Sequence, residues 1–321
     1  MSSDNGLSAQ SRELQGLMER VHEIAQTKGP VSIAVVNRKG GVGKSSIVTN
    51  MACELARRGL KVLVVGLCGQ VGVAVDLGAR NLSDEGASIA DYVLGEGDDV
   101  AIVPNVRPNL DVIFGGKRLP ILETLVGENA KSVPGGDAIA RFRDVMLAKF
   151  DPYDVVLMDF PPQQTVTQMM GFTVTDWVLI PTRNDDESMN GVAEMPDLLE
   201  NARRLNPDIQ VLGVTLFMHP TRSTAVRREW QEEMAQIAPQ FPVLDTFIPH
   251  SLPVSAGSRK RGVVVRELVP QLAGSIATRI QALREGKSPA RAISESTAKS
   301  IADAYEALTL EVIRKIVEAA R

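Results

Sequence analysis

The sequence predicts an α/β protein: a three-layer sandwich in which helices cover both faces of a mostly parallel, twisted sheet, with a helical extension at each end. Two observations predict it. Short apolar runs rich in β-branched residues, such as 31–36, 60–66 and 155–158, alternate with helical segments, and helical crossovers place such strands parallel. The chain is also long enough, at 321 residues with 44% hydrophobic, to bury a large core.

A glycine-rich turn follows the first apolar run and leads into a helix predicted from Ser46 to about Arg58. Glycines let several backbone N–H groups converge on an anion, and the helix adds its positive end. Lys44 would contact the β- and γ-phosphates of a nucleotide, and Ser45 would bind Mg²⁺ through its hydroxyl. The predicted nucleotide-binding loop consists of Lys39, Gly40, Gly41, Val42, Gly43, Lys44, Ser45 and Ser46.

A second motif, the run Val-Val-Leu-Met-Asp at 155–159, is an apolar strand that ends in a carboxylate. This pattern is typical of a Walker B strand, because α/β sheets bind ligands at the carboxyl ends of their strands. Asp159 is therefore predicted to hold Mg²⁺ through its water shell. Pro161, Pro162 and the polar residues 163–165 would form a switch segment that senses the γ-phosphate.

The loop departs from the general G-x-x-x-x-G-K-[ST] pattern, because Arg38 stands where the first glycine is expected. The segment Lys-Gly-Gly-Val-Gly-Lys-Ser at 39–45 resembles the deviant Walker A box of the ParA/MinD superfamily, and the Asn-Arg-Lys lead-in resembles its ParA branch. The resemblance covers roughly residues 31–284 and implies a P-loop NTPase-type fold with ATP and Mg²⁺ as cofactors. It also implies a nucleotide-sandwich homodimer, with Lys39 reaching across the interface and Lys39 and Lys44 as the catalytic residues.

The end of the second strand departs from this family. The family normally continues Asp-x-Asp-Pro-Gln-Gly-Asn (the Walker A′ motif), whereas this chain has Gly66 and Cys68 at the two aspartate positions. In the family those carboxylates orient the water that attacks the γ-phosphate. Neither glycine nor a neutral thiol replaces an anionic acceptor, so hydrolysis is predicted to be slow or absent unless another acid substitutes. Asp76 is the alternative acid, although it lies eight residues beyond Cys68 in the sequence.

The remaining elements follow from hydrophobic periodicity. Residues 8–27 predict an amphipathic helix that stops at Gly29-Pro30. Apolar runs predict further strands at 110–114, 176–182 and 211–218. Helices are predicted over 136–149, 188–205, 221–237, 264–284 and 294–320, with a loop at 258–262.

The resemblance also suggests where the base and DNA would bind. Met218 and Pro249 would approach the adenine, with plain core packing as the alternative. Family members bind DNA non-specifically through basic residues in two regions, and phosphate contacts need only clustered cations. The alternative for such clusters is a solvated run of charge. The candidate DNA-binding residues are Arg222, Arg227, Arg228, Arg259, Lys260 and Arg261.

The domain organisation is predicted from the ends of the resemblance. Residues 1–30 form an N-terminal helical extension, 31–284 the ATPase domain, and 285–321 a linker with a C-terminal helix. The polar face of that last helix mixes acidic and basic residues, which is a poor fit to anionic lipid. We therefore expect a packing or dimer-contact helix and no membrane association.

Composition excludes several classes of protein. The net charge of −4, from 35 basic and 39 acidic residues, excludes a globally polycationic nucleic-acid binder. No run of about 18 apolar residues predicts a membrane span, and no signal-peptide core is present. The two cysteines form no disulfide or metal-binding pattern, which suits the reducing cytoplasm.

The sequence leads to two main hypotheses. The first is a cytoplasmic, nucleoid-associated, ParA-like partition or positioning protein that binds ATP and Mg²⁺, dimerises, binds DNA non-specifically and responds to a ParB-like partner. The second is a nucleotide-gated binding module, or regulatory pseudo-ATPase, without turnover. A MinD-like positioning ATPase that associates with membranes is a further alternative.

Overall fold

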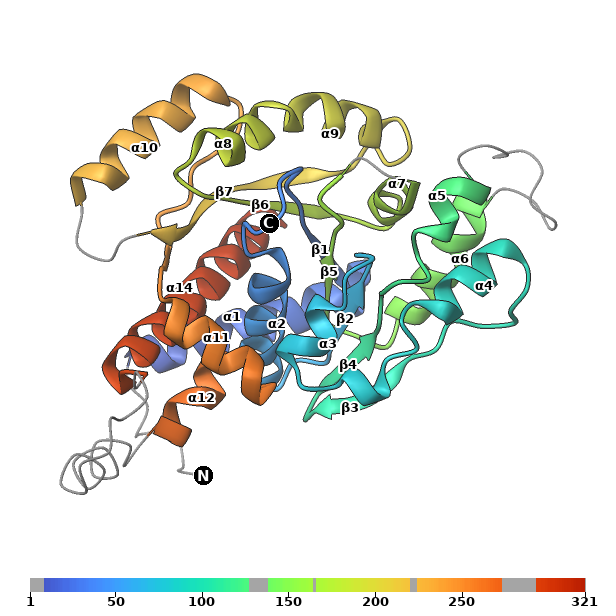
Figure 1. The fold of residues 1–321 in the computed structure, drawn as a ribbon, viewed down its shortest axis with the longest axis horizontal. Helices are drawn as coiled ribbons and strands as arrows, with labels where there is room; N and C mark the ends of the chain where they lie inside the picture. The colour runs from blue at the N-terminus through green and yellow to red at the C-terminus, as the bar shows by residue number, and fades with distance from the viewer. Residues whose placement is uncertain (1–8, 127–137, 164–165, 220–223, 273–292, 321) are drawn as a thin grey trace, which may run out of the picture.

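The computed structural model describes residues 9–126, 138–163, 166–219, 224–272 and 293–320 (Figure 1). Within them, eight strands form one sheet in the order β3-β4-β2-β5-β1-β6-β7-β8. Every neighbouring pair is parallel except β3 and β4, which confirms the predicted mostly parallel sheet. The strands are β1 Val31–Val35, β2 Val62–Gly66, β3 Val103–Arg107, β4 Leu110–Ile113, β5 Val155–Asp159, β6 Trp177–Thr182, β7 Gln210–His219 and β8 Ile248–Pro249.

Helices cover both faces of the sheet, as predicted (Figure 1). Alternate side chains of each strand enter different hydrophobic clusters, because successive residues point to opposite faces. Ile33 and Val64, for example, belong to one cluster, and Ala34 and Leu63 belong to the other. The helices are α1 Ala9–Lys28, α2 Lys44–Arg57, α3 Gly72–Asp76, α4 Ala87–Leu94, α5 Ile121–Leu125, α6 Ala138–Phe150, α7 Val166–Phe172, α8 Asp186–Ala193, α9 Met195–Arg203, α10 Thr224–Ile237, α11 Leu252–Arg261, α12 Val265–Leu272 and α14 Glu295–Ala319.

Two predictions about elements need correction, and one strand was missed. The helix predicted over 188–205 is two helices, because Pro196 falls in the first turn of α9 and cannot continue the hydrogen bonds of α8. The loop predicted at 258–262 is instead the last turn of α11, which Gly262 ends with a left-handed φ of 63°. The edge strand β3 was not predicted at all. The part of the predicted helix 264–284 beyond Leu272 lies outside the described residues.

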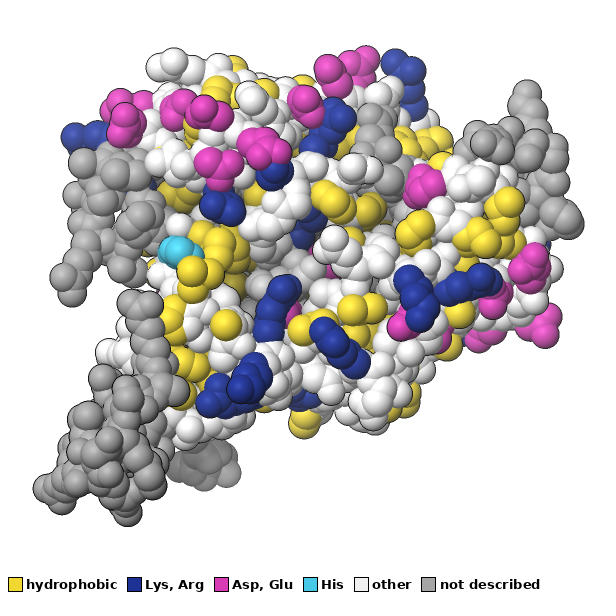
Figure 2. All heavy atoms as spheres, in the orientation of Figure 1, with side chains coloured by type: hydrophobic (Ala, Val, Ile, Leu, Met, Phe, Trp, Pro, Cys, Tyr) yellow, Lys and Arg dark blue, Asp and Glu magenta, His cyan; other side chains and the backbone are white. Residues whose placement is uncertain are grey.

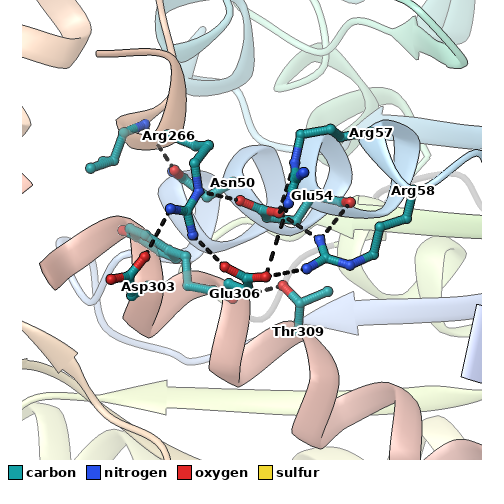
Figure 3. Close-up of polar contacts among 10 residues, drawn as sticks. Asn50, Glu54, Arg57, Arg58, Arg266, Asp303, Glu306 and Thr309 are labelled. Carbon is teal, nitrogen blue, oxygen red and sulfur yellow. Dashed lines mark hydrogen bonds and ion pairs between the residues drawn. The ribbon is translucent and has the colours of Figure 1, made fainter. Parts of the chain in front are cut away.

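A cluster of charged side chains connects the C-terminal helix α14 to α2 through hydrogen bonds and ion pairs (Figure 3). Arg57 Nη2, Arg58 Nη1 and Arg266 Nε donate to the Glu54 carboxylate at 2.9, 2.6 and 3.0 Å. From α14, Glu306 accepts from Arg266 at 2.5 Å and also from Arg58. Burial alone would raise the pKa of Glu54, but the hydrogen bonds from the three arginines outweigh it and lower that pKa.

The helices α1 and α14 both pack on the body of the protein. The apolar stripe of α14, including Leu308, Val312 and Ile316, is buried in the same hydrophobic cluster as β1 and α2. At the far end, Lys28 Nζ of α1 donates to the Ala320 carbonyl at 3.0 Å. None of the described helices has the length and apolar character that a membrane span needs.

Candidate nucleotide-binding site

The glycine-rich loop joins β1 to α2 as predicted, and two of its glycines have conformations that favour glycine. Gly41 and Gly43 have left-handed φ values of 77° and 89°. A Cβ atom at Gly43 would also lie 2.4 Å from the Phe217 ring at the end of β7. The loop thus lies against a side chain near the end of β7, with the first turn of α2 directly behind it. This arrangement directs the N-terminus of α2 toward an anion.

Lys44 lies at the centre of this loop. Its ammonium donates to the carbonyl oxygens of Lys39 and Asn37 at 2.8 and 3.1 Å. Burial lowers the pKa of Lys44, while the nearby Asp159 and Cys68 act to raise it. An ammonium has three donors, so these two bonds leave one for a phosphate oxygen.

The side chains of Ser45 and Asp159, the two residues predicted to hold Mg²⁺, are in direct contact. The Ser45 hydroxyl donates to Asp159 Oδ2 at 2.6 Å, and Asp159 is only 1% exposed. Within the described residues Asp159 Oδ1 has no hydrogen-bond partner. Burial, more than any other cause, raises the pKa of Asp159 to about 6. A hydroxyl beside a buried carboxylate with a free oxygen is a donor set that fits Mg²⁺.

These residues line a cleft of about 220 Å³ at the carboxyl ends of the strands. The glycines of the loop, Lys44, Ser45 and Ser46 form one wall, and Asp159, Phe160 and Pro162 form another. Cys68, Gln70 and Arg259 complete the lining. Sequence reasoning did not place Arg259 here, because it belongs to α11, far along the chain.

Positions 66 and 68, where the family has aspartate, differ in their surroundings. Cys68 lines the cleft, and burial raises the pKa of its thiol, so the side chain is neutral near pH 7. Gly66 instead lies against the backbone of a neighbouring strand end. A Cβ atom at Gly66 would lie 2.7 Å from the backbone nitrogen of Gly115. A carboxylate therefore has room at position 68 and none at position 66.

Asp76 lies closer to the loop than its place in the sequence suggests. The short helix α3 turns it back toward α2, where Asp76 Oδ2 accepts from the Ser46 hydroxyl at 3.1 Å. Its other oxygen accepts from Arg259 Nε at 2.8 Å. Burial raises the pKa of Asp76, against the opposing effects of Arg259 and Ser46.

Lys39 is held by α8 within the single chain. Its ammonium forms an ion pair with Glu187, and the neighbouring Arg38 pairs with Glu194 at 2.7 Å. Its backbone N–H donates to the Asn37 side chain at 2.8 Å. Glu187 is largely exposed, so its hold on Lys39 is weak. The role of Lys39 in a partner subunit stays a prediction.

The candidate adenine contacts lie at the same edge of the sheet as the loop. Met218, near the end of β7, has a left-handed φ of 61°, which is rare for a residue with a side chain. Pro249 is buried in β8, which pairs with β7. Their contact with a base stays a prediction. Phe217, which sequence reasoning passed over, is the side chain that packs on the loop.

The five candidate DNA-binding residues that the structure describes lie on two different helices, α10 and α11. Arg222 lies outside the described residues, and Arg227 stacks over Phe247 with 5.1 Å from Cζ to the ring centre. In Figure 1, α10 and α11 lie apart. On this face acidic side chains gather over α8 and α10, while basic ones gather near α11 (Figure 2). On α11, Lys260 and Arg261 are exposed, whereas Arg259 also lines the cleft. DNA binding stays a prediction.

Comparison with known proteins gives a consistent set of relatives. A family model described as an AAA domain matches residues 31–211. The chain is 30% identical to the chromosome partitioning protein ParA of Caulobacter vibrioides over 227 residues, which cover 70% of this chain and 82% of that protein. It is 30% identical to the chromosome-partitioning ATPase Soj of Thermus thermophilus over 224 residues, which cover 68% of this chain and 81% of Soj.

Solved structures share the fold, among them the following two. The cell division ATPase MinD of Pyrococcus furiosus has a TM-score of 0.57 at 20% identity, covering 87% of this chain and 99% of MinD. Cobyrinic acid a,c-diamide synthase of Mycobacterium smegmatis, solved with a bound ATP analog and magnesium, has a TM-score of 0.61 at 22% identity. That match covers 73% of this chain and 93% of the synthase.

Proposed function

The chain belongs to the ParA/MinD superfamily of P-loop ATPases, and on that basis we propose that it binds ATP with Mg²⁺ and acts as a nucleotide-dependent partition or positioning protein. The observation that carries this proposal is the convergence of Lys44, Ser45 and Asp159 in one cleft, with Asp159 Oδ1 buried and unpartnered among the described residues. Bound Mg²⁺ would neutralise charge on the phosphates. The loop N–H groups and Lys44 would bind the phosphates themselves.

The nucleotide would act by closing a homodimer. Lys39 would leave Glu187 and reach the phosphates of the partner subunit, since an exposed ion pair costs little to break. Residues 31–284 would supply this ATPase function, with 1–30 and 285–321 as accessory segments. Size-exclusion chromatography with light scattering, with and without a non-hydrolysable ATP analogue, tests dimerisation. The variant Lys39→Gln should stay monomeric while it still binds nucleotide.

The dimer would bind DNA without sequence preference and respond to a ParB-like partner. Lys260 and Arg261 support this proposal best, because both are exposed on the last turn of α11. Such contacts weaken with salt. Fluorescence anisotropy on a short duplex of arbitrary sequence should detect ATP-dependent binding that the double variant Lys260→Ala/Arg261→Ala loses. Nucleoid association would follow from this binding.

A second candidate function is a nucleotide-gated module without turnover, which the neutral thiol of Cys68 and the closed position of Gly66 favour. Single-turnover hydrolysis, measured with and without DNA, separates the two. Turnover that disappears in Lys44→Ala would eliminate the second candidate.

Calorimetric titration with ATP and Mg²⁺ tests the proposal itself. We expect saturable binding that Lys44→Ala abolishes, because Lys44 is the buried cation of the loop. Lys61→Ala is the matched control, because Lys61 is exposed beside β2 and away from the cleft residues. Absence of saturable binding to the wild-type protein would overturn the proposed function.

A further inference from the structure

Arg259 lies between a buried carboxylate and the cleft. Its Nε donates to Asp76 at 2.8 Å, and Asp76 also accepts from the Ser46 hydroxyl of the loop. The side chain of Asp76 is 7% exposed and that of Arg259 is 52% exposed. Arg259 also lines the cleft with Lys44, Ser45 and Ser46. The guanidinium therefore has one side on Asp76 and another toward the space where the phosphates would lie.

Within the part of the chain that the structure describes, the two terminal nitrogens of Arg259 remain available as donors. Among the described residues only Nε has an acceptor, and a guanidinium carries five N–H donors in a planar fork. Arginine is suited to phosphate because that fork can bind two oxygens at once. An arginine held by Nε alone keeps this capacity for a ligand.

The backbone brings α11 to this position through a close contact with α3. A Cβ atom at Gly262 would lie 2.3 Å from Gly78 Cα, so the two helix ends meet with glycines at both positions. Arg107 bridges the same junction by donating to the carbonyls of Leu77 and Gly262 at 3.3 and 3.2 Å. Asp76 and Arg259 are thus brought together by the fold and do not depend on their own ion pair alone.

We propose that Arg259 is a phosphate-binding residue of the cleft, positioned by Asp76 so that its terminal nitrogens face the nucleotide. This inference rests on the proposed nucleotide binding and adds to it. Lys44 would supply one cation from the loop, and Arg259 would supply a second from α11. Binding of phosphate would then also draw α3 and α11 to the loop, which links the nucleotide to the basic end of α11.

The test measures how single substitutions change the affinity of the protein for two phosphate ligands, in the absence of DNA. Affinities for ATP with Mg²⁺ and for inorganic tripolyphosphate are measured by calorimetry. Arg259→Ala should weaken both by about tenfold or more, the usual effect of losing a hydrogen bond between charged groups. Arg259→Lys should recover only part of the loss, because lysine keeps the charge without the fork. Lys61→Ala, which removes an exposed cation that is not among the residues lining the cleft, should stay within about twofold.

Arg259→Ala alone would leave the Asp76 carboxylate buried without its cation, so a second variant guards against misfolding. Asp76→Asn/Arg259→Ala removes that charge as well, and its melting temperature should be close to that of the wild type. The same loss of affinity in both variants supports the inference. Wild-type affinity in both, beside normal binding by the wild-type protein, overturns it and leaves the proposed function intact. Absence of binding to the wild-type protein overturns both.

Discussion

Asp159 shows how the site uses a residue whose surroundings oppose its charge. Burial raises its pKa from 3.8 to about 6, so the folded protein holds this proton more tightly than the unfolded chain does. The protonated carboxyl of Asp159 therefore stabilises the fold at low pH, and this contribution is lost as pH rises from about 4 to 6. Above that range the buried carboxylate is charged, which lowers the free energy of unfolding by about 3 kcal/mol. A bound Mg²⁺ would offset that cost by giving the carboxylate a counter-charge.

We predict that Asp159→Asn stabilises the nucleotide-free protein at neutral pH, because a neutral amide avoids this cost. Urea denaturation should show a gain in unfolding free energy of up to about 3 kcal/mol near pH 7.5, and most of that gain should be gone near pH 4. Ser45→Ala is the control for loss of the shared hydrogen bond. An Asn variant that is less stable than the wild type at pH 7.5 would contradict the prediction.

Positions 66 and 68 should respond differently to an introduced acid. Cys68→Asp places a carboxylate in the cleft, and we expect single-turnover hydrolysis to rise by about 100-fold, which is the scale of a positioned acid–base group. Gly66→Asp should instead lower the melting temperature without raising the rate, because its Cβ meets the Gly115 backbone at 2.7 Å. Cys68→Asn controls for shape. An unchanged rate in Cys68→Asp would mean that the attacking water is positioned by another group.

At the scale of elements, the contact of α2 with α14 depends on a carboxylate that is almost fully buried. Glu54→Gln would leave Arg58 and Arg266 short of negative charge, and we expect a loss of about 3 kcal/mol in unfolding free energy at neutral pH. Glu54 is 3% exposed, whereas its partner Arg57 is 54% exposed. Arg57→Ala should therefore cost no more than about 1 kcal/mol.

The same cluster predicts a dependence on pH. Because the pKa of Glu54 is lowered on folding, its contribution is present at neutral pH and is lost as pH falls through that pKa. The difference between Glu54→Gln and the wild type should accordingly shrink in acid. Denaturation curves near pH 7 and pH 3.5 measure it, and a difference that does not change with pH would contradict the assignment.

Elements could be predicted where hydrophobic periodicity was strong and were missed where it was weak. The strands β1, β2 and β5 are fully buried and appear in the sequence as mostly apolar runs. The helix α11 buries only Val254, Gly257 and Ser258 and so has no apolar stripe, although Pro253 in its first turn is a usual start signal. The edge strand β3 is partly exposed and contains Pro104, which argues against a strand.

The same reasoning explains which site residues were predicted. Lys44 and Ser45 lie in one contiguous motif, and Asp159 follows a recognisable strand, so local pattern was enough. Arg259 and Asp76 are separated by 183 residues, and no local pattern pairs them. Their meeting depends on how α3 and α11 dock, which is a property of the tertiary fold.

For the whole molecule, α14 is predicted to be part of the folding unit. Deleting residues 294–321 would expose the apolar faces of α1 and α2 that now pack on Leu308, Val312 and Ile316. We expect a truncated protein that binds a hydrophobic dye and loses its cooperative thermal transition by circular dichroism. A truncated protein that melts as sharply as the full chain would show instead that α14 is peripheral.

The contact between Lys28 and Ala320 has a practical consequence. Ala320 borders a cavity with Pro30, Val31 and Gln210, and residues 31 and 210 are where β1 and β7 begin. The nucleotide cleft lies at the carboxyl ends of the strands, which form the opposite edge of the sheet. A fluorophore or surface tether attached after α14 would accordingly stand clear of the cleft. Single molecules could be immobilised by this end and watched while ligands come and go.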